Sequence, residues 1–242
     1  MIDFHTHIGN FFDLYTSPSK LTRVMDSVGA ERFACSSTTI CEGDYDKVLA
    51  EMLELQALAG HRLLPVLWIV PQMLHDSGLQ QFLDSGIPWR MLKIHPQLHP
   101  LAWHCGGDNL RKVLKLVKKL HVPLLIHTGE SIGCYPSLFE RAIRYNPSVM
   151  FILAHGRPIG ETIALLQRYP NVLTDTAFMP VEHIAELCQR GLSHKILWGT
   201  DIPIQKYYNR SENLIDYYQN RLRKLKTAVT IEQYETILTN HI

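Results

Sequence analysis

Short apolar runs alternate with amphipathic stretches along almost the whole chain. The apolar runs are rich in β-branched residues and have the length of β-strands. Several of them, including Val122–Ile126 and Met150–Ala154, are continuously apolar, as expected for parallel strands that are covered on both faces. The predicted strands are Ile2–His5, Arg32–Ser36, Leu63–Val70, Arg90–His95, Pro123–His127, Val149–His155, Val172–Asp175 and Lys195–Thr200.

The stretches between these runs show the periodicity of amphipathic helices. Apolar residues recur at i, i+3, i+4 and i+7, with basic residues on the opposite side, which we interpret as solvated helix faces. Start signals support the same helices, because Ser, Asp and Pro favour the first turn. Helices are predicted after Ser17-Pro18, after Asp108, from Val181, after Ser211 and behind a capping box of Thr230 and Gln233.

The number of units predicts the architecture. Eight strand–helix units in 242 residues come to about 30 residues each, the size of one βα unit. Eight such units predict a closed (β/α)8 barrel, an α/β fold of the TIM-barrel type. An open doubly wound sheet is the alternative that the same alternation allows. Because no linker or change of composition interrupts the pattern, we expect a single domain over residues 1–242.

Composition narrows the classes of function. Lys and Arg number 24 and Asp and Glu 23, so the net charge of +1 gives no electrostatic reason to expect nucleic acid or an anionic membrane as partner. The five cysteines form no C-x-x-C pair and no disulfide framework, and the N-terminus has no leader pattern, so we expect a cytoplasmic protein. The unusual feature is 13 histidines, since histidine is the commonest metal ligand and the proton shuttle of neutral pH.

Several of these histidines stand at the ends of predicted strands. His5 and His7 form an H-x-H pair, and residues two apart in a strand face the same side. His127, His155 and Asp201 end the fifth, sixth and eighth strands, and all strand ends of a barrel meet on the C-terminal rim. Each residue alone could be a core histidine or a helix cap. Together, imidazoles and one carboxylate predict a site for zinc or another divalent transition metal.

Five short motifs follow one another along the chain: D-F-H-T-H at 3–7, K-I-H-P at 93–96, L-I-H-T-G at 125–129, A-H-G at 154–156 and G-T-D-I-P at 199–203. In this order they resemble the metal-dependent amidohydrolase superfamily, and within it the amidohydrolase 2 branch with its aminocarboxymuconate-semialdehyde decarboxylase-like proteins. The resemblance covers essentially the whole chain. It implies a (β/α)8 barrel with a divalent metal, usually zinc, bound by His5, His7, His127 and Asp201. It also implies that His155 is a catalytic residue or a ligand of a second metal.

The loops of the rim supply candidates for substrate binding. We expect Lys93, His95, Glu130 and Arg157 to contact substrate, with one metal ion bound. We expect Lys93 to be unmodified and to lie away from that ion, or near Glu130 or a ligand anion. The lysine strand also resembles that of dihydroorotase-type barrels, where the lysine is carboxylated, so a second ion is the alternative. Aromatic walls with basic residues beside a metal suit a small cyclic or unsaturated carboxylate. The other rim residues are Phe11, Phe12, Tyr15, Gln97, His99, Trp103, His104, Lys206, Tyr207 and Tyr208.

The predicted site favours hydrolysis of an amide, ester or lactone in a small, carboxylated substrate. A metal activates water and polarises a carbonyl, Asp201 serves as proton shuttle, and His155 polarises the carbonyl or orients the nucleophile. Alternatives are a metal-dependent decarboxylase of an unsaturated acid, a TatD-like nuclease, a phosphoesterase and a non-catalytic metal-binding protein. The nuclease expects a glutamate where Lys93 stands, and the phosphoesterase expects Asp-x-His instead of Asp201-Ile202-Pro203. Because the barrel is short for its branch, a homo-oligomer that completes the mouth is a further expectation.

Overall fold

The strands form one sheet that curves around the centre of the molecule. The computed structural model describes residues 1–98 and 107–241. Within these residues the strand order is β2-β1-β3-β4-β5-β6-β7-β8-β9, and every neighbouring pair is parallel except β1 and β2. The strands are β1 (Ile2–Phe11), β2 (Leu14–Thr16), β3 (Arg32–Ser37), β4 (Leu63–Trp68), β5 (Met91–Ile94), β6 (Leu124–His127), β7 (Phe151–Ala154), β8 (Val172–Asp175) and β9 (Ile196–Leu197).

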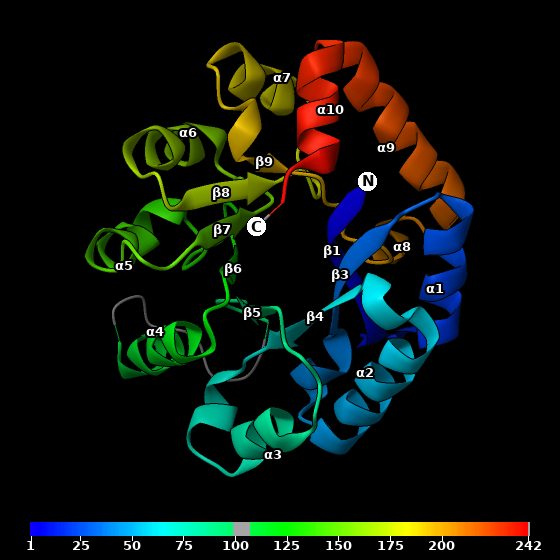
Figure 1. Ribbon diagram of the computed structural model, residues 1–242, viewed down its shortest axis with the longest axis vertical. Helices are drawn as coiled ribbons and strands as arrows, with labels where there is room; N and C mark the ends of the chain where they lie inside the picture. Colours follow the sequence, from blue (N-terminus) through cyan, green and yellow to red (C-terminus); the bar gives the residue numbers. More distant parts are fainter. Residues whose placement is uncertain (99–106, 242) are drawn as a thin grey trace.

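The segment that follows β9 closes the sheet against β1. The backbone N–H of His7 donates to the carbonyl of Ile202 at 2.7 Å, and the N–H of Asp201 donates to the carbonyl of His5 at 2.7 Å. Helices surround the closed sheet on the outside (Figure 1). The predicted (β/α)8 barrel is therefore confirmed and the open sheet is excluded. Closure also brings Asp201 beside the H-x-H pair, which is almost 200 residues away in the chain.

Local sequence signals set the helix ends. The side chain of Ser17 accepts from the backbone of Lys20 at the start of α1, and the capping box of Thr230 and Gln233 opens α10. No helix in the described parts of the chain has the length and apolar character that crossing a membrane requires. The helices are α1 (Pro18–Ser27), α2 (Tyr45–Ala59), α3 (Gly78–Asp84), α4 (Asp108–Leu120), α5 (Glu140–Tyr145), α6 (Ile159–Arg168), α7 (Val181–Gln189), α8 (Gln205–Tyr208), α9 (Leu214–Ala228) and α10 (Ile231–Thr239).

Two apolar layers explain why the strands are continuously apolar. Leu125 of β6 packs inside the barrel with Phe4 and Ile152, whereas Leu124 and Ile126 belong to the larger cluster between strands and helices. Because successive strand side chains point to opposite faces, a strand such as β6 needs apolar residues at consecutive positions to fill both layers.

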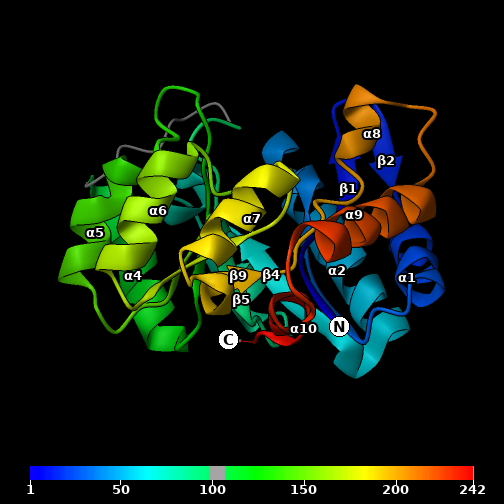
Figure 2. The same cartoon turned by 90° about the horizontal axis from the view of Figure 1, so that it is seen from above.

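The first strand differs most from its prediction. It was expected at Ile2–His5 but continues to Phe11 and turns back into β2. This hairpin stands above the C-terminal rim beside α8 (Figure 2). His5 and His7 therefore lie within the strand, and the hairpin beyond them supplies one wall above the site. The last strand is shorter than expected, with only Ile196 and Leu197 in regular pairing.

Candidate metal centre and active site

Three ligand-type atoms converge on the rim of the barrel. The Oδ1 atom of Asp201 lies 3.0 Å from Nε2 of His7 and 3.4 Å from Nε2 of His5. In a tetrahedral zinc site with bonds of about 2.0–2.1 Å, neighbouring ligand atoms are about 3.3 Å apart. The Oδ1 atom is buried and has no hydrogen-bond partner in the described residues. This donor set and its spacing fit a divalent ion.

The other ring nitrogen, Nδ1, of His5 and of His7 contacts a residue that was not predicted as part of the site. Nδ1 of His5 lies 2.8 Å from Oδ2 of Asp175, and Nδ1 of His7 lies 3.0 Å from Oγ of Ser36. Such partners orient metal-binding imidazoles and fix which nitrogen is free. Asp175 ends a predicted strand in the same way as the candidate ligands do, and this position was the available signal.

Lys93 lies among the candidate ligands. Its Nζ atom is 2.9 Å from Nε2 of His5 and 3.0 Å from Nε2 of His7, and it sits 4.4 Å from the centre of the Trp68 ring. Lys93 therefore lies beside the candidate metal position, where the negative charges of Asp201 and Asp175 act on its ammonium. An ammonium donates to the same lone pairs that a metal needs, so Lys93 and a metal compete for these two rings.

The remaining rim histidines form a second group next to the first. One ligand atom each of His5, His155 and Asp201 lie within 4.8 Å of one another. Nε2 of His155 is 3.9 Å from Oδ2 of Asp201 and 3.0 Å from Nδ1 of His127. The ring of His127 stacks on that of His95 at 3.7 Å. The structure thus places His127 against His155 and His95, and the tightest contacts to Asp201 come from the H-x-H pair.

Burial determines the charges of these groups. Desolvation lowers the pKa of His155 to about 4, and desolvation together with Lys93 lowers the pKa of His7 to about 3, so both rings are neutral at pH 7. Burial lowers the pKa of Lys93 to about 8, against the attraction of Asp201. Burial would raise the pKa of Asp201, but its interactions with His5 and His7 outweigh this and hold the pKa well below its usual range. The site therefore combines an ionised carboxylate with neutral imidazoles.

The cluster forms the floor of a cleft with a volume of about 660 Å³. Arg157 lines this cleft, and its Nη1 atom lies 3.9 Å from Oε2 of Glu130, whose side chain is 59% exposed. The Nε atom of Arg157 is buried and has no hydrogen-bond partner in the described segments. The predicted rim residues His99, Trp103 and His104 lie outside the described residues. The lining residues are His7, Phe11, Phe12, Thr38, Trp68, Lys93, His95, Leu98, His127, Ser131, His155, Arg157, Phe178, Asp201, Ile204, Tyr207 and Tyr208.

One wall of the cleft is a series of aromatic rings. Ring centres are 5.1 Å apart for Phe12 and Tyr207, 5.4 Å for Tyr207 and Tyr208, 5.9 Å for Tyr208 and Phe178, and 6.1 Å for Phe178 and His155. The series runs from Phe12, which is 63% exposed, to the buried His155. It joins the hairpin, α8 and the loop after β8 into one surface that suits a planar, apolar part of a ligand.

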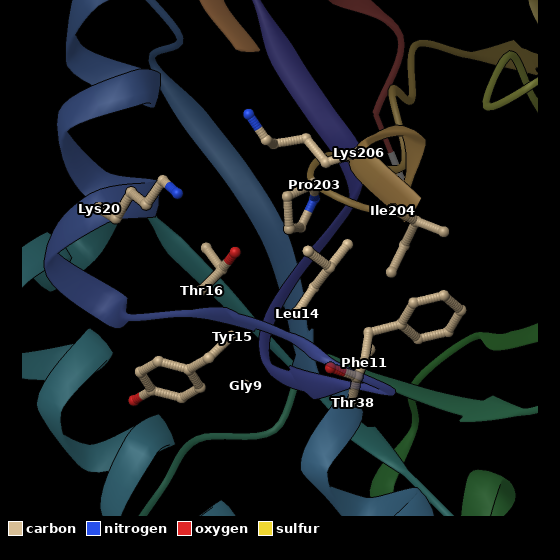
Figure 3. Close-up of a pocket in the computed structure, with 10 residues that line it drawn as sticks. All are labelled: Gly9, Phe11, Leu14, Tyr15, Thr16, Lys20, Thr38, Pro203, Ile204 and Lys206. Atoms are coloured by element: carbon tan, nitrogen blue, oxygen red, sulfur yellow. The ribbon is translucent and has the colours of Figure 1, made fainter. Parts of the chain in front are cut away.

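A second cavity lies on the other side of the hairpin. It is lined by Leu14 and Phe11 of the hairpin and by Pro203 and Ile204, and its volume is about 40 Å³ (Figure 3). Lys206 also reaches it, and its Nζ atom donates to the carbonyl of Glu212 at 2.9 Å. This volume suits water rather than a substrate, so the larger cleft is the candidate active site.

A (β/α)8 barrel with histidines and an aspartate gathered on its rim defines the class of metallo-dependent hydrolases. The chain belongs to the amidohydrolase family, whose sequence pattern it matches over residues 2–217. Members of this superfamily are enzymes that typically bind divalent metals, and the His/His/Asp cluster is of that kind. No curated protein matches the chain by sequence.

Solved structures share the fold at low sequence identity. A probable 2-pyrone-4,6-dicarboxylic acid hydrolase from Acinetobacter baumannii has a TM-score of 0.69 and 12% identity, over 99% of this chain and 96% of that chain. A 4-oxalomesaconate hydratase from Rhodopseudomonas palustris has a TM-score of 0.63 and 13% identity, over 98% of this chain and 93% of that chain. A dihydroorotase from Campylobacter jejuni has a TM-score of 0.60 and 13% identity, over 98% of this chain and 80% of that chain. At these identities the likeness concerns the fold alone.

Proposed function

We propose that the protein is a metal-dependent hydrolase that cleaves an amide, ester or lactone bond in a small, carboxylated substrate. The observation that carries this proposal is the buried Oδ1 of Asp201, which lacks a hydrogen bond and lies 3.0–3.4 Å from two imidazole nitrogens. His5, His7 and Asp201 would hold the metal, with His127 and His155 beside them. A divalent ion there would polarise a carbonyl and bring the pKa of a water toward about 7.

Asp201 and His155 have the charge states that proton transfer requires. Asp201 is ionised at pH 7, so it can take a proton from the attacking water and return it to the leaving group. Nδ1 of His155 lies 3.0 Å from the carbonyl oxygen of Ala177, which can only accept, so the ring proton is on Nδ1. Nε2 is then an acceptor. His155 is therefore suited to orient the water rather than to donate to a substrate carbonyl.

The basic residues of the cleft suit a substrate carboxylate. Arg157 presents a buried Nε–H without a partner, and its ion pair with Glu130 is long, at 3.9 Å. A carboxylate can accept from Nε–H and an Nη–H at once. When a metal occupies the lone pairs of His5 and His7, the ammonium of Lys93 needs another anion, and a second substrate oxygen can supply it. The aromatic wall favours a planar body between these ends.

A substrate panel tests the proposal. Zinc-loaded protein is assayed with carboxylated lactones, amides and esters, with their uncharged methyl esters, and with the Asp201→Asn and Arg157→Gln variants. We expect turnover of carboxylated compounds, a loss of turnover in Asp201→Asn, and a raised KM with little change in kcat in Arg157→Gln. Turnover that survives without Asp201, or that is equal for the uncharged esters, contradicts the proposal.

The same panel separates the other candidate reactions. Release of carbon dioxide from unsaturated carboxylic acids would identify a decarboxylase, and cleavage of a phosphodiester would identify a nuclease. Lys93 lines the cleft where a TatD-like nuclease would place a glutamate, so we expect no phosphodiester cleavage.

A further inference from the structure

The loop after β8 holds the ring of His155. The carbonyl of Ala177 lies 3.0 Å from Nδ1 of His155, and the N–H of Ala177 donates to Oδ1 of Asp175 at 3.0 Å. The next residue, Phe178, has a φ of +51°, a left-handed conformation that is unfavourable for an aromatic residue. Such a conformation persists only where its surroundings hold it in place.

An arginine of a helix that is distant in the chain forms hydrogen bonds to this loop on both sides of Phe178. Arg221 of α9 donates through Nη1 to the carbonyl of Met179 at 2.9 Å and through Nη2 to the carbonyl of Thr176. The two carbonyls flank Ala177 and Phe178 in the chain. A planar guanidinium can serve two carbonyls at once because its N–H groups form a rigid fork, whereas an ammonium is a point donor. Burial lowers the pKa of Arg221 from its high ordinary value, and the group keeps its charge at neutral pH.

We propose that Arg221 is a positioning residue for His155. By holding the carbonyls of Thr176 and Met179, it fixes the carbonyl of Ala177, which keeps the ring proton of His155 on Nδ1. Nε2 of His155 then stays unprotonated, 3.0 Å from Nδ1 of His127 and 3.9 Å from Oδ2 of Asp201. The catalytic part of this inference rests on the proposed function, whereas the tautomer can be measured without a substrate. The role extends the active site to a helix that does not touch the cleft.

The test compares two arginines on the same helix. Arg221→Gln removes the grip on the loop. Arg223→Gln is the matched control, because Arg223 is exposed and its side chain donates to Asn220 of the same helix. Long-range ¹H–¹⁵N spectra of ¹⁵N-labelled protein report which ring nitrogen of His155 carries the proton, with the signals assigned through His155→Asn. The same proteins are assayed with a substrate found in the panel.

We expect the Nδ1–H tautomer of His155 in the wild type and in Arg223→Gln, and a mixture of tautomers in Arg221→Gln. We expect kcat to fall about tenfold in Arg221→Gln with KM changed less than about twofold. Millimolar guanidinium should restore both readouts in Arg221→Ala, and this comparison replaces the glutamine variant if that variant does not fold. An unchanged tautomer and kcat in Arg221→Gln, or a lack of rescue, overturns the inference. If the wild type hydrolyses nothing in the panel, the proposed function fails and the spectra still decide the role of Arg221.

Discussion

Replacing Asp175 by asparagine should weaken metal binding through the tautomer of His5. The carboxylate of Asp175 accepts at both oxygens: Oδ1 from the N–H groups of His155 (2.9 Å) and Ala177 (3.0 Å), and Oδ2 from Nδ1 of His5 (2.8 Å). This arrangement keeps a proton on Nδ1 of His5, so that its Nε2 presents a lone pair to the metal position. An asparagine has one accepting and one donating end, so it cannot accept from all three N–H groups.

The energetics decide which end of the asparagine faces His5. If the amide NH₂ faced the two backbone N–H groups, two buried hydrogen bonds would be lost, at about 1–3 kcal/mol each. The amide oxygen will therefore keep the backbone groups, and the NH₂ will donate to Nδ1 of His5. The ring proton then moves to Nε2, where it blocks the lone pair. Changes in such outer partners cost about 10–100-fold in metal affinity, and we expect the upper end, about 2.8 kcal/mol.

A chelator competition for zinc measures this affinity in the wild type and in Asp175→Asn. Asp3→Asn is the matched control. Asp3 is also buried, and its Oδ1 accepts from the N–H of His5, while its Oδ2 accepts from the hydroxyl of Thr200. An amide can replace it, because its NH₂ can donate to that hydroxyl and its oxygen can keep the backbone N–H. Zinc affinity within about twofold of wild type in Asp175→Asn would refute the tautomer argument, since the expected loss is much larger.

Three further predictions concern neighbouring groups. Asp201→Asn should keep the fold and lose about 10²–10⁴-fold in kcat, because an amide cannot take a proton from water. Circular dichroism checks the fold and steady-state rates check kcat. A variant with more than about a tenth of the wild-type rate would show that another residue transfers the proton. Lys93→Met should bind zinc about tenfold more tightly, or by about 1.4 kcal/mol, because the ammonium that competes for the Nε2 atoms of His5 and His7 is removed. The same chelator competition measures this, and weaker zinc binding in Lys93→Met would show that Lys93 supports the metal. Burial raises the pKa of Asp3 to about 7, so between about pH 4 and 7 the folded state holds a proton that the unfolded state has lost. Stability should therefore fall as pH rises through this range, and urea titrations of Asp3→Asn should show a smaller fall; an equal slope in both proteins contradicts this.

The barrel could be predicted from the sequence because the apolar residues of its strands indicate that the strands are buried on both faces. Val172–Asp175 was predicted with the bounds that the structure has. Leu124–His127 was predicted to within one residue, because a strand covered on both faces is apolar over most of its length. The hairpin was not predicted, because Leu14–Thr16 is too short to show a period and pairs only with its neighbour. The end of the first strand was misplaced because its continuation to Phe11 pairs with this unpredicted strand.

The candidate ligands were also visible in the sequence, but their outer partners were not. His5, His7 and Asp201 stand at strand ends, and a closed barrel places such ends on one rim. The pairing of Asp175 with His5 and the grip of Arg221 on the loop after β8 depend on side-chain geometry across distant elements. Lys93 shows the same limit, because strand position alone does not say whether its long side chain turns toward the ligands or toward the substrate.

The metal content of the protein decides whether the barrel rim is a metal site. Wild-type protein and the His5→Ala/His7→Ala double variant are incubated with zinc, passed through a desalting column and analysed for metal by mass spectrometry. We expect about one equivalent of zinc in the wild type and almost none in the double variant, because removing two of three ligands leaves a single carboxylate to hold the ion. A wild type without zinc, or a double variant that retains as much zinc as the wild type, would contradict this expectation.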